Sequence, residues 1–230
     1  MRLQKFLSKA GICSRRKGEE YIKAGFIRVN NIVVTELGTK IDPIKDRVEF
    51  KGKSVLPKSD LVYIALNKPK GYVTSCSQPG EKIVLDLIHI SQRVYPIGRL
   101  DKDSTGLLIL TNDGALHHRL LHPSFDHEKE YDVTVARPIT DGDLRTMATG
   151  MMLSGRRTRP ARVRRVSAKR FRIVLQEGRN RQIRRMLGQL NHEVLRLKRT
   201  RMAGVHLGRL PEGTWRHLTG KEKQALIKML

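Results

Sequence analysis

The sequence has few cysteines and no long apolar run, and these absences exclude several large classes of protein. Only two cysteines, Cys13 and Cys76, occur among its 230 residues, which is too few for a zinc cluster or a disulfide framework. We expect both thiols to be reduced, as is usual in the cytoplasm. No apolar run approaches the roughly 18 residues that span a bilayer, and the basic N-terminus lacks the apolar core of a signal peptide. The sequence therefore predicts a cytoplasmic protein that does not span a membrane.

Acidic residues are scarce relative to basic ones. The 46 lysines and arginines outnumber the 22 acids, giving a net charge of +24. A protein this basic is expected to bind a polyanion, usually nucleic acid, with an anionic membrane surface as the alternative. Residues 137–203 hold 19 basic residues against four acids, whereas residues 61–136 hold eight against nine. The near-neutral segment follows another basic one, so a site within it could be flanked by phosphate contacts.

The near-neutral segment contains the stretch that best fits a reactive site. From Pro96 to Gly114 the chain reads PIGRLDKDSTGLLILTNDG. The apolar run at residues 107–110 predicts a short buried strand, so Asp101 and Asp103 are expected in the irregular loop before it. Loop residues held by a rigid strand are a common place for catalysis.

Three interpretations of this loop compete. In the first, Asp103 and Thr105 hydrogen-bond to nearby backbone and shape a turn. In the second, the loop binds calcium, because its acids match the first and third positions of an EF-hand loop. Asn112 at the twelfth position cannot supply the bidentate carboxylate, which disfavours calcium. In the third, Asp101 is a catalytic carboxylate, and Arg99 meets the same ligand because side chains two apart in an extended segment share a face.

The N-terminal segment predicts two short helices and a hairpin. These are a helix at residues 2–10 ended by Gly11, a helix from Arg15 to Ala24 capped by Ser14 and ended by Gly25, and strands at residues 27–29 and 32–34 joined by Asn30-Asn31. This arrangement resembles the S4 RNA-binding domain. The resemblance rests on Leu3, Lys5, Phe6, Gly11, Ser14, Arg15, Arg16, Gly25, Ile27, Val29 and Asn30.

Arg15, Arg16 and Lys17 begin the second helix, where cations oppose the helix dipole. That penalty favours phosphate contacts over a simply solvated helix start. The polar stretch from Lys51 to Asp60 shows no period, and we interpret it as a linker. The chain is therefore divided into an S4-like RNA-binding domain at residues 1–58 and a second domain at residues 59–230.

The second domain has the pattern of an α+β fold. Strands are expected at residues 61–67, 72–74, 107–110, 131–135, near 162–164, at 171–175, 194–197 and 205–207, and helices at 84–90, 115–121, 138–150, after Gly178 and at 221–230. Arginines alternate with apolar residues in the strands at 162–164 and 171–175, a pattern suited to a nucleic-acid backbone. His118 and His122 have the spacing of metal ligands on a helix, but no third ligand follows, so solvent-facing or capping roles are favoured.

Several motifs resemble the RsuA/RluB/RluF family of ribosomal RNA pseudouridine synthases, most closely its F-type members, which act on large-subunit RNA. They are Asn67-Lys68-Pro69-Lys70-Gly71, Gly98-Arg99-Leu100-Asp101 with Asp103 and Gly106, Thr111-Asn112-Asp113-Gly114, Lys129-Glu130-Tyr131, the segment from Glu177 to Leu187, Arg199-Thr200-Arg201 and Gly213-Thr214-Trp215-Arg216. Ser104-Thr105 stands where the family usually has Thr-Ser. The resemblance covers nearly the whole chain. It implies a mixed, mostly antiparallel sheet with flanking helices for the second domain.

The resemblance also implies roles for particular residues. Asp101 is the catalytic residue, Tyr131 packs on the target base, and Arg184 forms an ion pair with Asp101. Arg99 is our candidate to fill the space that a flipped base leaves. The remaining arginines of the Glu177–Leu187 segment are assigned to phosphates, namely Arg179, Arg181 and Arg185.

The implied reaction converts a uridine in ribosomal RNA, in particular large-subunit RNA, to pseudouridine. It needs no cofactor or metal, and the sequence leaves open whether Asp101 acts at C1′, C2′ or C6. A monomer is expected. The alternative is a non-catalytic S4-type RNA-binding factor for ribosome assembly, in which Asp101 would be dispensable.

Overall fold

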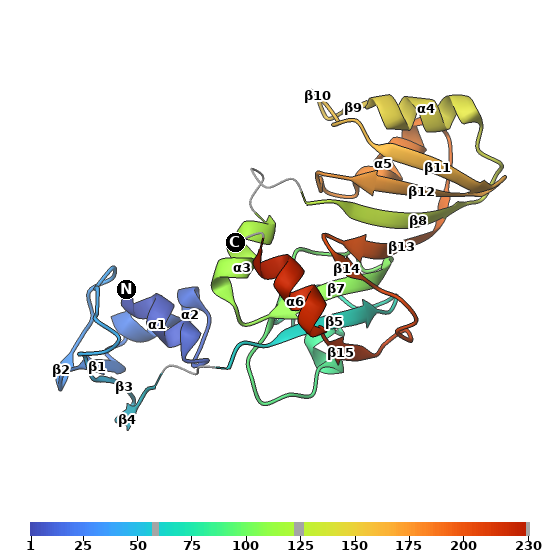
Figure 1. Cartoon of the computed structure of the whole chain (residues 1–230). Helices are drawn as coiled ribbons and strands as arrows, with labels where there is room; N and C mark the ends of the chain where they lie inside the picture. The colour runs from blue at the N-terminus through green and yellow to red at the C-terminus, as the bar shows by residue number, and fades with distance from the viewer. Residues whose placement is uncertain (57–59, 122–126, 229–230) are drawn as a thin grey trace. The chain divides into compact units, whose positions relative to one another are not determined.

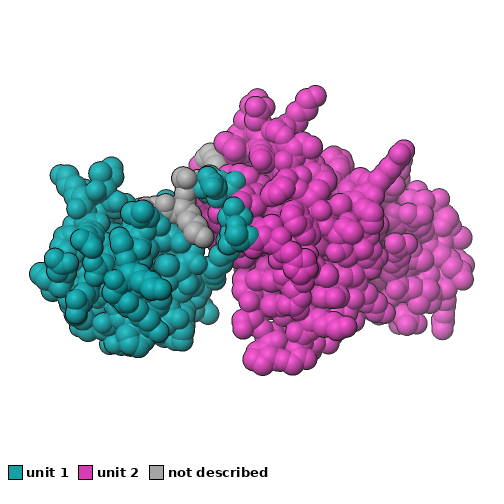
Figure 2. All heavy atoms as spheres, turned by 90° about the horizontal axis from the view of Figure 1, so that it is seen from below, with its two compact units in different colours: residues 1–61, 91–93 teal, residues 62–90, 94–230 magenta. Residues whose placement is uncertain are grey.

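The computed structural model describes residues 1–56, 60–121 and 127–228. The chain forms two compact units, one of Met1–Leu61 with Ser91–Arg93 and one of Val62–Ile90 with Val94–Leu230 (Figure 2). The predicted domain boundary between residues 58 and 59 lies outside the described residues.

The first unit has two helices and a four-stranded sheet with the order β2-β1-β3-β4. Its elements are α1 (Leu3–Lys9), α2 (Arg15–Lys23), β1 (Ile27–Val29), β2 (Ile32–Val33), β3 (Val48–Phe50) and β4 (Lys53–Ser54). The apolar face of α1, with Leu3, Phe6 and Leu7, packs with Ile22 of α2 and Ile27 of β1. The two predicted helices and the hairpin are confirmed.

Local chemistry accounts for the ends of these elements. The Ser14 side chain accepts a hydrogen bond of 3.1 Å from the backbone N–H of Lys17 and so caps α2. Asn30 and Asn31 have φ of 53° and 68°, the conformation that a two-residue hairpin turn requires. The predicted linker begins too early, because Lys51 and Gly52 form the turn between β3 and β4, with Lys51 at φ 50°.

The second unit is built on a mixed, mostly antiparallel sheet of nine strands (Figure 1). Its main path is β11-β12-β8-β13-β7-β5-β15, with β14 paired to β13 and β6 paired to β7. The strands are β5 (Tyr63–Lys68), β6 (Tyr95–Ile97), β7 (Thr105–Thr111), β8 (Lys129–Val135), β11 (Arg162–Ser167), β12 (Arg170–Leu175), β13 (Val194–Met202), β14 (Val205–His206) and β15 (Trp215–His217). A separate hairpin joins β9 (Met152–Leu153) to β10 (Arg156–Arg157).

Helices cover the two faces of this sheet unequally. They are α3 (Gly114–Leu121), α4 (Asp141–Thr149), α5 (Gln182–Gln189) and α6 (Gly220–Ile227). On one face, α4 and α5 pack over β8, β11 and β12. On the other face, α3 and α6 pack behind β5 and β7.

Two predicted elements were wrong. Residues 72–74 form no strand; Val73 makes a single bridge to Ile83, while the Thr74 side chain bonds to Leu100 in a loop. The predicted helix at 84–90 is only a 3-10 turn, η1 (Val84–Leu87). Strands β6 and β15, each of only three residues, were also not predicted from the sequence.

The order of strands at the centre of the sheet positions the site. β13 lies between β7 and β8, parallel to β7 and antiparallel to β8. Four residues consequently form one row across four strands, in the order Lys68, Gly106, Arg199 and Tyr131. Because directly paired residues point to the same face of a sheet, this row defines one face.

Candidate active site

Asp101 lies in the loop between β6 and β7, as predicted, and that loop is held by its neighbours. The backbone N–H of Leu100 donates to Thr74 Oγ1 at 3.2 Å, and this hydroxyl donates back to the Leu100 carbonyl at 2.8 Å. The Gly71 N–H donates to the carbonyl of Lys102 at 2.9 Å. Bonds on both sides of Asp101 therefore fix its backbone, while its side chain stays partly accessible.

A buried lysine holds the loop that contains Asp101 through hydrogen bonds to backbone carbonyls. Lys68 is fully buried, and its Nζ donates to the carbonyls of Pro69 at 2.9 Å, Ser104 at 2.9 Å and Lys102 at 3.4 Å. Burial lowers the pKa of Lys68 to about 8, although the charges of Asp101 and Asp103 oppose this shift. The motif containing Lys68 was recognised in the sequence, but its role in fixing the loop was not.

Gly106 brings the end of the loop against β13. A β-carbon at this position would lie 2.3 Å from the carbonyl oxygen of Arg199, and Gly106 has φ of +104°. Only glycine allows such an approach. Arg199 is itself buried, and its Nε donates to the carbonyl of Leu107 at 2.7 Å. The loop is thus joined to the centre of the sheet.

Tyr131 lies on the same face of the sheet as Lys68 and Arg199. It is paired with Arg199 across β8 and β13, and it packs against the apolar cluster that contains Leu100, the residue before Asp101. Its ring is half-buried rather than enclosed in the core. This position is compatible with the predicted stacking role.

The arginine beside Asp101 differs from the one predicted. Arg181 Nη1 lies 3.8 Å from both the Asp101 and the Asp103 carboxylates. Arg184 instead donates to the Asp103 carbonyl at 3.2 Å and the Val194 carbonyl at 3.3 Å. Arg181 takes a left-handed conformation, φ 48°, immediately before α5, which sequence spacing does not reveal. Burial lowers the pKa of the Arg184 guanidinium.

Of the other predicted RNA-binding residues, some are exposed and others already form hydrogen bonds within the protein. Arg99 is exposed beside Asp101. Arg179 is engaged: its guanidinium bonds to Glu177 and to the carbonyls of Arg156 and Arg157, which favours a structural role over phosphate contact. Arg185 is half-buried and donates to the Ser154 hydroxyl.

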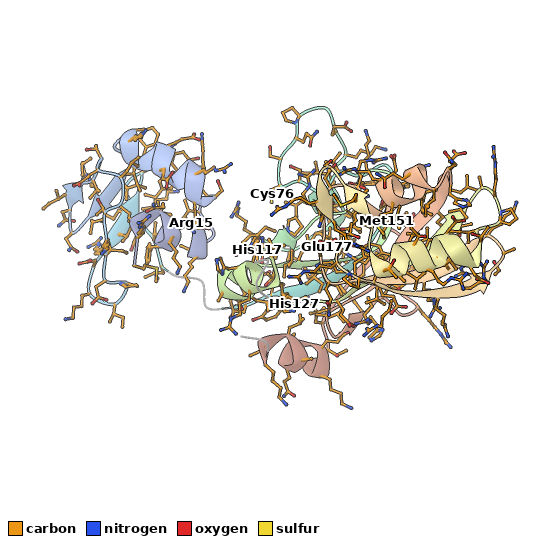
Figure 3. All side chains as sticks on the ribbon, turned by 90° about the horizontal axis from the view of Figure 1, so that it is seen from above. Arg15, Cys76, His117, His127, Met151 and Glu177 are labelled. Carbon is orange, nitrogen blue, oxygen red and sulfur yellow. The ribbon has the colours of Figure 1, made fainter. Side chains whose placement is uncertain are left out.

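In the first unit, Arg15 and Arg16 are exposed at the start of α2; Figure 3 labels Arg15. Lys17 is also exposed and forms an ion pair of 2.5 Å with Glu20. Arg15 and Arg16 thus remain the better placed of the three for phosphates.

The described residues contain no group of three or more His, Cys, Asp or Glu that could hold a metal ion. His122, half of the predicted histidine pair, lies outside these residues. No helix among them is long and apolar enough to cross a membrane.

Comparison with known proteins agrees with this geometry. Residues 62–189 match the RNA pseudouridylate synthase family, and residues 1–48 match the S4 domain. The chain therefore belongs to the RNA pseudouridylate synthase family, and it is an isomerase with an N-terminal S4 domain.

Among its relatives is the dual-specificity RNA pseudouridine synthase RluF of Shigella flexneri, 44% identical over all of this chain and 79% of the relative. Another is the ribosomal large subunit pseudouridine synthase B of Bacillus subtilis strain 168, 41% identical over 98% of this chain and 95% of that protein. A crystal structure of a pseudouridylate synthase superposes with a TM-score of 0.72 and 30% identity, covering 98% of this chain and 99% of that one.

Proposed function

We propose that this protein converts a uridine of ribosomal RNA to pseudouridine and that Asp101 is the catalytic residue. The observation that carries the proposal is the position of this carboxylate. It is partly accessible on a loop that Lys68 and Thr74 fix, and Arg181 lies beside it. A positive charge beside it suits a carboxylate that acts as nucleophile or base.

The reaction balances without a second substrate. The bond between N1 of uracil and C1′ of ribose breaks, the base rotates, and C5 bonds to C1′ while the proton on C5 is lost and N1 gains one. Asp101 acts on the ribose or on the base as nucleophile or base. The uridine must first leave its stack, at a cost of about a few kcal/mol. Arg99, exposed two residues from Asp101, is placed to occupy the vacated space.

Tyr131 and Arg184 take supporting roles. The half-buried ring of Tyr131 offers a surface on which the flipped uracil stacks. Arg184 joins the Asp103 carbonyl to β13 and so holds the loop rather than the carboxylate itself. Arg181 takes the ion-pair role with Asp101.

Large-subunit RNA is the proposed target, because the Bacillus subtilis relative is named for the large ribosomal subunit. Arg15 and Arg16 in the S4 domain supply phosphate contacts. The protein acts as a monomer in the cytoplasm, where ribosomal RNA is found in bacteria such as those of the relatives.

The test compares wild type, Asp101→Asn and Asp103→Asn on unmodified ribosomal RNA transcripts, with pseudouridine mapped by carbodiimide and primer extension. Asp103→Asn is the matched control because it removes the same charge from the same loop. We expect a new stop with wild type and Asp103→Asn and none with Asp101→Asn. Stops with all three proteins would remove Asp101 from the reaction. RNA binding without any stop would favour the ribosome-assembly factor.

A further inference from the structure

On the face opposite Asp101, the sheet of the second unit has a charged area on which no helix packs. We propose that this area binds the phosphates of an RNA segment other than the one that carries the target uridine. The inference deepens the proposed function and rests on it for the identity of the RNA. It concerns the outer face of β8, β11, β12 and β13, called here the back face.

The packing of the helices defines this face. Tyr131, Val133 and Phe171 point toward α4 and α5. Asp132 and Arg172, which alternate with them along β8 and β12, therefore point the other way. Figure 1 shows α4 and α5 on one side of these strands. On the other side, α3 and α6 pack behind β5 and β7, and no apolar cluster of the described residues covers the back face.

Charged side chains cover the back face instead, and the positive ones are in excess. Its acids are Glu128, Glu130 and Asp132, and its cations are Arg162, Arg164, Arg170, Arg172, Arg196, Lys198 and Arg201. Seven cations against three acids leave a local excess of positive charge on this face.

The acids are already used by four of these cations. Glu128 pairs with Arg162 at 2.5 Å and with Arg201 at 2.9 Å. Asp132 pairs with Arg170 at 2.6 Å. Glu130 pairs with Arg201 at 3.2 Å, and Arg172 approaches Glu130 and Asp132 only to 3.8 Å each. The three acids of this face are thus already paired with these arginines.

Three cations of the back face have no such partner. Among the described residues, no acid lies within 4 Å of Arg164, Arg196 or Lys198. Arg164 is directly opposite Arg172 in the pairing of β11 with β12. Like charges in that position destabilise a sheet, so an external anion lowers the free energy of the arrangement.

RNA is the anion that fits the back face of an RNA-modifying enzyme. The row Arg164, Arg172, Asp132 and Lys198 runs across four strands, which are spaced about 4.8 Å apart, so the row is long enough to contact more than one phosphate. A short hairpin that delivers uridine to Asp101 lies on the other face of the sheet. Only a larger folded RNA presents a second segment to the back face while the uridine occupies the site.

The experiment uses two RNAs and two sets of substitutions in the full chain. The test variant carries Arg164→Gln, Arg196→Gln and Lys198→Gln. The control carries Arg145→Gln, Lys221→Gln and Lys228→Gln, an equal loss of charge at exposed positions of α4, α6 and the residue after α6. Filter binding and pseudouridine formation are measured on a short hairpin and on a full-length large-subunit transcript across a salt series. Binding to phosphatidylserine vesicles is measured alongside.

We expect the test variant to bind the long transcript about tenfold more weakly, with a salt slope reduced by about 2 to 3 for three lost phosphate contacts. Its binding and turnover on the hairpin should equal those of wild type, and the control should bind both RNAs as wild type does. A variant with Arg164→Lys and Arg196→Lys keeps all three charges and should bind the long transcript nearly as wild type does.

Equal losses in the test and control variants would overturn the proposal, because they would reflect net charge alone. A loss of vesicle binding with RNA binding unchanged would also overturn it and assign the face to lipid. The binding measurement stands even if no pseudouridine forms. A failure of the proposed function is therefore distinguishable from a failure of the back face to bind RNA.

Discussion

The backbone of Arg199 occupies the space beside Gly106 so closely that a β-carbon on Gly106 would lie 2.3 Å from the Arg199 carbonyl oxygen. We expect Gly106→Ala to destabilise the fold by about 3 kcal/mol or more, because both the contact and the positive φ are unfavourable. Gly155→Ala is the control, since Gly155 also has positive φ but meets nothing within 4 Å. It should cost about 1 kcal/mol. Urea unfolding measures both, and equal losses would contradict the steric argument.

Replacing Lys68 should impair catalysis more than substrate binding. Lys68→Met leaves the Ser104 and Lys102 carbonyls without their buried donor, so the loop that holds Asp101 loses its support. A displacement of the carboxylate by about 1 Å can lower kcat on the order of 100-fold. Steady-state kinetics on a short RNA would test this, with Lys70→Met as the control on the exposed neighbouring turn. Unchanged kcat would show that the loop keeps its position without the lysine.

The same lysine predicts a dependence of stability on pH. Burial lowers the pKa of Lys68 to about 8 in the folded protein, from its ordinary 10.5. Above pH 8 the unfolded chain holds this proton longer than the folded one, so stability from this group rises with pH up to about 10.5. Relative to Lys68→Met, wild type should gain about 2 kcal/mol between about pH 7.5 and about pH 9.5. A difference that does not change with pH would contradict the lowered pKa.

Arg181 and Arg184 should differ in how well a lysine replaces them. Arg181 lies by the carboxylates, so Arg181→Met should lower kcat and Arg181→Lys, which keeps the positive charge, should restore most of it. Arg184 bonds to two backbone carbonyls, so Arg184→Lys, which lacks the planar fork of donors, should lower kcat nearly as much as Arg184→Met. The reverse result would restore Arg184 as the ion-pair partner of Asp101.

Substitutions of Tyr131 separate stacking from proton transfer. If the ring only stacks, Tyr131→Phe should retain most activity, while Tyr131→Ala should lose about 10- to 100-fold, matching roughly 1 to 3 kcal/mol for one stacked base. Initial rates on one short RNA measure both. Loss in both variants would assign a chemical role to the hydroxyl.

Much of the fold was predictable because its signals are local. Helix α2 has its cap at Ser14, the first hairpin has its asparagine turn, and the apolar run of β7 is too short for anything but a strand. Elements without a period of their own were not predictable. β6 contains Pro96, which weakens a strand prediction, and residues 72–74 are fixed by the side chain of Thr74.

For the site, the sequence placed Asp101 in its loop but did not identify the groups around it. Lys68 appears in the sequence analysis only as part of a family motif, and the pairing of β5 with β7 is what brings its ammonium against the loop. Arg181 and Arg184 are three residues apart in an arginine-rich segment. Arg181, with its left-handed backbone just before α5, is the one that lies beside the carboxylates, and spacing along the sequence does not reveal this.

The place of β13 between β7 and β8 also has a consequence for folding. β7 and β8 follow one another along the chain, yet a strand synthesised much later separates them in the sheet. The bond from Arg199 to Leu107 closes a sequence separation of 92 residues, and such distant pairings form slowly. A nascent chain that ends before β13 already contains Asp101 and Tyr131. It lacks the strand that lies between β7, which follows the Asp101 loop, and β8, which contains Tyr131. Catalytic competence should therefore arise late in synthesis, after the RNA-binding S4 domain has been made.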